Sequence, residues 1–142
     1  MNGWRIDNID LLVHDADAMA TFYHDVLGCP FFLPYEPGAG WFAFQAGDVT
    51  VYVFETKVEG PPAHRTDDTD TNPAGVDSFA FAVDDLDVAI ADLDGRVTWA
   101  AEAERWDHPS GTWYRYRSFY DPEGNIVHVT EPHEARPAGR TS

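Results

Sequence analysis

Residues 6–17 read IDNIDLLVHDAD and residues 76–87 read VDSFAFAVDDLD, so one pattern occurs twice, about half a chain apart. The identical positions are Asp7 and Asp77, Val13 and Val83, Asp15 and Asp85, and Asp17 and Asp87. An internal repeat indicates that the chain is built from repeated structural units. This repeat predicts two copies of one supersecondary module in a chain of 142 residues.

Each copy changes its hydrophobic period from that of a strand to that of a helix. Alternating Ile9, Leu11 and Val13 predict a strand. Asp15 is a good N-cap for a following helix, and Gly28 is a good terminator. The second copy predicts a strand over 79–83 and a helix over 85–95 by the same criteria.

Further strands are expected after each helix, and they define the fold class. Apolar runs predict strands over 41–45, 49–55, 97–100, 112–119 and 125–130. We therefore expect an α+β fold of two tandem β-α-β-β-β modules within a single domain. The expected parts are module 1 at about 4–56, a polar linker at about 57–74, module 2 at about 75–132 and a frayed tail at 133–142.

The composition is strongly acidic, with 25 Asp and Glu residues against 9 Lys and Arg, a net charge of −16. This charge argues against nucleic acid or an anionic membrane as a partner. A single cysteine, Cys29, excludes an intrachain disulfide. With no apolar run of membrane-spanning length and no secretory-type N-terminus, we expect a cytoplasmic protein. The acidity fits either a solvated or salt-adapted surface or the steering of a cationic ligand.

Two stretches carry a resemblance to a known family: VHDADAMATFYHDVLG at 13–28 and FYDPEGNIVHVTEP at 119–132. Together with the two modules, they resemble the vicinal oxygen chelate superfamily, which includes glyoxalase I, extradiol dioxygenases and bleomycin-resistance proteins. The resemblance implies curved mixed sheets with a concave cleft, where the enzymes hold a divalent metal. The implied ligand positions are Asn8, Tyr52, Ser78 and His128.

Three of these four positions hold an amide, a phenol and a hydroxyl, which are poor primary ligands for a divalent cation. We therefore predict no metal and no cofactor. The ending DPEGNIVHV at 121–129 is similar to that of the bleomycin-resistance branch, which also lacks the metal ligands. That resemblance implies a homodimer in which Trp41 and Trp113 enclose a flat aromatic drug.

Strand alternation predicts one face packed on helices and one face open to the cleft. The predicted ligand-binding residues are Trp41, Trp113, Tyr52, Phe54, His128, Leu12, Asp10, Asn8, Ser78 and Trp106. Trp106 is expected in a loop, as a cleft rim or as packing. No catalytic residue is predicted, because His128 with Asp10 is the only acid–base pair that the cleft could offer and nothing in the sequence shows that the two touch.

We predict a metal-independent protein that sequesters a toxic aromatic antibiotic of the bleomycin, mitomycin or enediyne type, giving self-resistance without modifying the drug. The alternative is a glyoxalase-like lyase or a dioxygenase-like enzyme of the same superfamily. A third hypothesis is a ligandless interaction domain. The identity and affinity of the ligand, any residual catalysis and the swapping mode of the dimer stay open.

Overall fold

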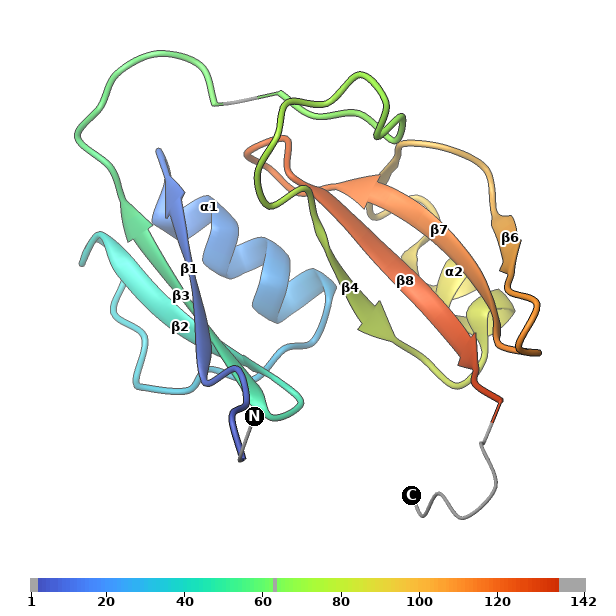
Figure 1. Cartoon of the computed structure of the whole chain (residues 1–142). Helices are drawn as coiled ribbons and strands as arrows, with labels where there is room; N and C mark the ends of the chain where they lie inside the picture. The colour runs from blue at the N-terminus through green and yellow to red at the C-terminus, as the bar shows by residue number, and fades with distance from the viewer. Residues whose placement is uncertain (1–2, 63, 136–142) are drawn as a thin grey trace. The chain divides into compact units, whose positions relative to one another are not determined.

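The computed structural model describes residues 3–62 and 64–135, so most of the predicted tail lies outside the described residues. The chain divides into two compact units (Figure 1). The first unit comprises residues 1–64 and 121–124, and the second comprises residues 65–120 and 125–142. Within the described ranges, no helix is both long enough and apolar enough to cross a membrane.

The first unit holds a small sheet and one helical segment. Its elements are β1 (Asn8–Val13), α1 (Ala16–Ala20), the π-helical η1 (Thr21–Val26), β2 (Trp41–Ala46) and β3 (Val49–Glu55). The strand order is β1-β3-β2, with β1 parallel and β2 antiparallel to β3. A third strand after the helix, which the predicted β-α-β-β-β pattern requires, is reduced to an isolated bridge between Phe31 and Phe44.

The predicted ends of the first helix are confirmed, although its second half is π-helical. The Asp15 carboxylate accepts the N–H of Ala18 over 3.0 Å, as an N-cap does. The N–H of Leu27 then donates to the carbonyl of Phe22 five residues earlier. Gly28 has a φ of 76°, a left-handed conformation in which glycine carries no steric penalty, and it ends the helix.

The core of the first unit is aromatic. Tyr23, Phe42 and Phe44 are almost completely buried. The rings of Tyr23 and Phe44 stack with centroids 4.6 Å apart. The Tyr23 hydroxyl donates to Oδ2 of Asp121 over 2.8 Å, so the buried phenol has the partner that it needs.

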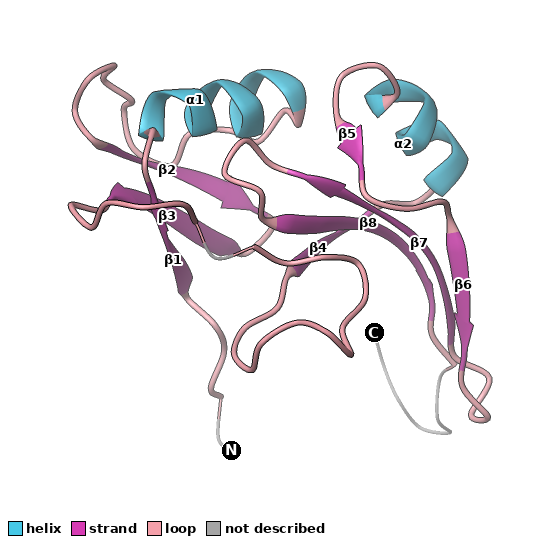
Figure 2. Ribbon diagram, turned by 90° about the horizontal axis from the view of Figure 1, so that it is seen from above, coloured by secondary structure: helices cyan, strands magenta, loops and turns pink. Residues whose placement is uncertain are grey.

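The second unit holds a larger sheet covered by one helix on one face, as Figure 2 shows. Its elements are β4 (Phe79–Ala82), α2 (Leu86–Leu93), β5 (Thr98–Trp99), β6 (Glu104–Asp107), β7 (Trp113–Tyr120) and β8 (Ile126–His133). The strand order is β4-β8-β7-β5, and β6 pairs with β7. The β4–β8 pair is parallel and the others are antiparallel.

Two features of the second unit differ from the sequence prediction. Strand β6 lies where a loop around Trp106 was expected. All its residues are exposed, and its sequence shows no alternation of apolar and polar residues. Strand β8 continues to His133, beyond the predicted end at residue 130. Both differences arise because β6 and β8 pair with the long strand β7. A local sequence pattern does not show such pairing.

Candidate functional site

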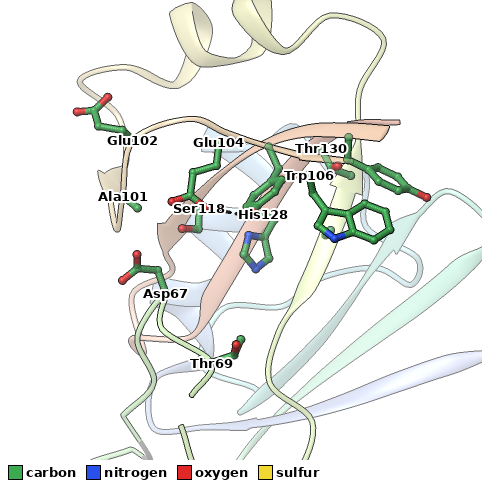
Figure 3. Close-up of a pocket in the computed structure, with 12 residues that line it drawn as sticks. Asp67, Thr69, Ala101, Glu102, Glu104, Trp106, Ser118, His128 and Thr130 are labelled. Carbon is green, nitrogen blue, oxygen red and sulfur yellow. Dashed lines mark hydrogen bonds between the residues drawn. The ribbon is translucent and has the colours of Figure 1, made fainter. Parts of the chain in front are cut away.

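A cavity of about 470 Å³ opens on the face of the second sheet that lies opposite α2 (Figure 3). Its volume falls within the usual range for small-molecule sites. The lining residues all belong to the second unit. They are Asp67, Thr69, Ala80, Ala101, Glu102, Glu104, Trp106, Tyr114, Tyr116, Ser118, His128 and Thr130.

The floor of the cavity follows from strand register. Ser118 pairs with His128, and Tyr116 pairs with Thr130, so these side chains share one face of β7 and β8. Ala80 of β4 pairs with His128 from the other side and leaves room above the sheet. The sheet therefore forms the floor of the cavity, with small residues at one edge and aromatic residues at the other.

Aromatic rings form one wall. Trp106 from β6 lies 5.7 Å from Tyr114, centroid to centroid, and is 46% exposed. Tyr116 meets His128 edge to face at 5.9 Å. The Tyr116 hydroxyl donates to Oε2 of Glu104 over 3.0 Å, and burial, followed by this bond, raises the pKa of Tyr116. The wall offers ring faces suited to a flat ligand.

Three carboxylates, of Asp67, Glu102 and Glu104, also line the cavity. In Figure 3 they lie to one side of the cavity, away from the indole of Trp106. Glu102 has a cationic neighbour, because Nη2 of Arg117 lies 3.5 Å from its Oε2. The described lining residues include no lysine or arginine, so together they carry a net negative charge.

Among the described lining residues, His128 carries the one imidazole. Its Nε2 lies 3.2 Å from Oγ of Ser78, whereas its buried Nδ1 has no hydrogen-bond partner within the described structure. Burial lowers the pKa of His128, against an opposing effect of Asp77. The ring is therefore neutral at neutral pH and can offer one donor and one acceptor.

Of the residues predicted in the second unit, His128 and Trp106 line the cavity, and Ser78 contacts His128. Trp113 lies on the opposite face of β7, so the expectation that it shares a face with His128 was wrong. Its ring stacks on His133 at 3.7 Å, and the Arg105 guanidinium lies 3.8 Å from its centroid. The alternation of side chains along β7 explains why Trp113 faces away from the cavity. Phe119, at the same parity as Trp113, is completely buried on the helix side.

The residues predicted in the first unit share one face of its sheet, as expected, but line a different surface. They are Asn8, Asp10, Leu12, Trp41, Tyr52 and Phe54. Phe54 stacks on Tyr52 at 6.0 Å and on Trp41 at 6.4 Å. Asp10 accepts a hydrogen bond from the Asn8 amide over 2.9 Å. Asp10 thus does not belong to the cavity that contains His128, and contact of these six residues with a ligand stays a prediction.

A sequence model of the Glyoxalase/Bleomycin resistance protein/Dioxygenase superfamily matches residues 5–129, which is most of the chain. The chain belongs to this superfamily. No curated protein matches the sequence.

Several solved structures share the fold. A lactoylglutathione lyase from Agrobacterium tumefaciens is 25% identical, with a TM-score of 0.64 over 92% of this chain and 96% of its own. An integron cassette protein from V. cholerae is 24% identical, with a TM-score of 0.66 over 92% and 97%. A glyoxalase/bleomycin resistance protein/dioxygenase from Alicyclobacillus acidocaldarius is 13% identical, with a TM-score of 0.66 over 94% and 96%.

The metal positions implied by the superfamily hold a poor donor set in this chain. His128 is accompanied by the Ser78 hydroxyl in the second unit, and the other two positions hold Asn8 and Tyr52 in the first. Within residues 3–62 and 64–135, no three His, Cys, Asp or Glu side chains gather as a metal site. A divalent cation prefers imidazole, carboxylate or thiolate ligands, so these residues do not fit one.

Sequence reasoning missed the residues that form most of the cavity, above all Tyr114, Tyr116 and Glu104. Tyr114 and Tyr116 alternate with Trp113, Arg115 and Arg117, so the sequence allows either set to face the cavity. Phe119 could have decided between the two sets, because it alternates with Trp113 and is too large an apolar residue to be left on an open face.

Proposed function

We propose that this superfamily member is a metal-independent binding protein that sequesters a flat aromatic natural product toxic to the cell. The class of ligand is that of bleomycin-, mitomycin- or enediyne-type antibiotics, held without chemical modification by a cytoplasmic homodimer. The observation that carries the proposal is the cavity of the second unit, whose wall presents Trp106, Tyr114 and Tyr116.

The physical basis of the proposal is the match between the cavity and a flat ligand. Each stacked aromatic pair contributes about 0.5–1.5 kcal/mol beyond the burial of its area. Trp106 is well placed for this role because almost half of its surface is exposed before a ligand arrives. The poor metal donor set around His128 and Ser78 supports binding over the metal-dependent chemistry of the superfamily enzymes.

The homodimer is supported by the exposed apolar face of the first unit. Leu12 is 70% exposed and Phe54 is 38% exposed on that face, beside Trp41 and Tyr52. Contiguous exposed apolar residues commonly mark an interface. Sedimentation equilibrium of wild type and Leu12→Glu tests this part: a dimer that dissociates in the variant supports it, and a monomeric wild type contradicts it.

The binding proposal is tested by quenching of tryptophan fluorescence with bleomycin, mitomycin C and an enediyne chromophore. We expect saturable quenching by at least one of them in wild type, and its loss in Trp106→Ala. Trp4→Ala is the matched control, because Trp4 is 78% exposed and outside the cavity lining. Equal quenching in all three proteins would show that the ligand does not use this cavity.

A glyoxalase-like lyase is the second candidate, favoured by the 25% identity to the lactoylglutathione lyase and by His128 inside the cavity. Elemental analysis of the purified protein separates the candidates. Stoichiometric nickel, zinc, iron or manganese, together with turnover of a hemithioacetal that chelation abolishes, would support the lyase and contradict simple binding.

A further inference from the structure

The second sheet separates its charged side chains by face. Strand β7 carries Arg115 and Arg117 on the side of α2, and Tyr114 and Tyr116 on the side of the cavity. Arg105 of β6 likewise lies against Trp113, away from the cavity lining. The sheet thus keeps its guanidinium groups out of the cavity while three carboxylates line it.

The three arginines are also engaged where they lie. Arg105 pairs with Asp107 over two hydrogen bonds of 2.9 Å. Arg115 donates to Asp87 over 2.7 Å. Arg117 donates its Nε–H to the carbonyl of Ala101 over 2.8 Å and lies 4.2 Å from the Trp99 ring centroid. Among the described residues, the contact of Arg117 with Glu102 is the one ion pair to a carboxylate of the cavity lining, and the Glu102 side chain is 92% exposed.

Glu104 is the carboxylate best placed to hold a ligand. The Tyr116 hydroxyl donates to its Oε2, which fixes the carboxylate beside the aromatic wall. A carboxylate has about four acceptor positions, so this one bond leaves capacity for further donors.

We infer that the ligand of this cavity is an organic cation, in which a protonated amine, amidine or guanidine is attached to a flat apolar body. The inference rests on the proposed binding function and specifies its ligand class. The cationic group would donate to Glu104, with Asp67 and Glu102 as further negative charges, while the flat body stacks on the aromatic wall. Ring faces attract cations as well, and the net charge of −16 adds attraction at long range.

The test uses three flat tricyclic probes of similar size: proflavine as cation, acridone as neutral compound and anthracene-2-sulfonate as anion. Dissociation constants are measured by fluorescence titration at low and at physiological salt, for wild type and four variants. Glu104→Gln removes the central charge, and Glu59→Gln removes one charge from an exposed site outside the cavity. Tyr116→Phe removes the hydroxyl alone, and Trp106→Ala removes one ring of the wall.

We expect proflavine to bind more tightly than the other two probes and to weaken as salt rises. Glu104→Gln should weaken proflavine binding about tenfold, the size of one lost charge-assisted hydrogen bond. Tyr116→Phe should weaken proflavine binding by less than Glu104→Gln does, because the negative charge stays and only the bond that fixes the carboxylate is lost. Glu59→Gln should stay within about twofold of wild type. Circular dichroism confirms that each variant is folded.

Three results would overturn the inference, and they distinguish a loss of cation selectivity from a failure of the proposed function. If acridone or the sulfonate binds as tightly as proflavine and Trp106→Ala abolishes that binding, the cavity binds ligands but does not select cations. The same conclusion follows if Glu104→Gln leaves proflavine binding unchanged. If no probe and none of the aromatic antibiotics binds in a Trp106-dependent way, the proposed function fails and the inference fails with it.

Discussion

Glu131 at the end of β8 accepts the backbone N–H of Leu86, the first residue of α2, over 2.8 Å. Glu55 at the end of β3 accepts the N–H of Ala16, the first residue of α1, over 3.0 Å. Helix N-termini leave backbone donors without intrahelical partners and favour negative charge. Both modules therefore attach their helix to their sheet by the same strand-end carboxylate, in addition to the aspartate N-caps.

This relationship predicts an acid-sensitive contribution to stability. The bond from Leu86, followed by that from His133, lowers the pKa of Glu131. A carboxyl with a lowered folded-state pKa stabilises the fold above its unfolded pKa, and this contribution is lost as pH falls through the folded value. We expect Glu131→Gln to lower the melting temperature at pH 7 and to converge on wild type as pH falls below about 4. Glu59→Gln is the control, and parallel curves at every pH would contradict the assignment.

We expect a second effect of pH on stability, from His128, at a higher pH. Burial lowers the pKa of His128 in the folded state, so the unfolded chain binds more protons as pH falls below about 6.5. The wild type should therefore lose stability from about pH 6.5 downwards, until the folded-state pKa is passed. Thermal unfolding of His128→Gln should show a smaller loss over that interval. An identical loss in the variant would place the titration elsewhere.

Trp113 should matter for stability and not for the cavity. It lies between the Arg105 guanidinium and His133, on the face opposite Tyr114. Trp113→Ala should reduce the free energy of unfolding by about 2 kcal/mol, less than a fully buried tryptophan because this one is half-buried. Urea denaturation measures this loss. Ligand affinity in the fluorescence titration should stay within about twofold, and a large loss of affinity would reverse the face assignment.

Tyr23→Phe should destabilise the first unit without touching the cavity of the second. The substitution removes the hydroxyl that donates to the buried Asp121 and leaves that carboxylate short of one donor. Such a loss costs about 1–3 kcal/mol. Tyr35→Phe is the matched control, because the Tyr35 hydroxyl donates to a less buried aspartate, Asp17, over 2.6 Å. Equal losses in the two variants would contradict the role of burial.

Local periodicity located most elements because each strand and helix start carries its own signal. The aspartate caps at Asp15 and Asp85 and the apolar alternation of β1 lie within a few residues, and the structure confirms them. Strand β6 carries no such signal, since its four exposed residues become a strand only by pairing with β7. The sequence predicted the cavity only in part. His128 lies on the cavity face as expected, whereas Trp113 lies on the other face of the sheet.

The repeat, the α+β class and the superfamily could be inferred without a structure, because they depend on short-range patterns of apolar residues, caps and turns. The tertiary structure alone decided which face of β7 opens to the cavity. A one-residue change of phase moves every side chain of a strand to the other face, and both phases of β7 carry aromatic residues. Burial of Phe119 against the helix side settles that phase, and so brings Tyr114, Tyr116 and Glu104 together around His128.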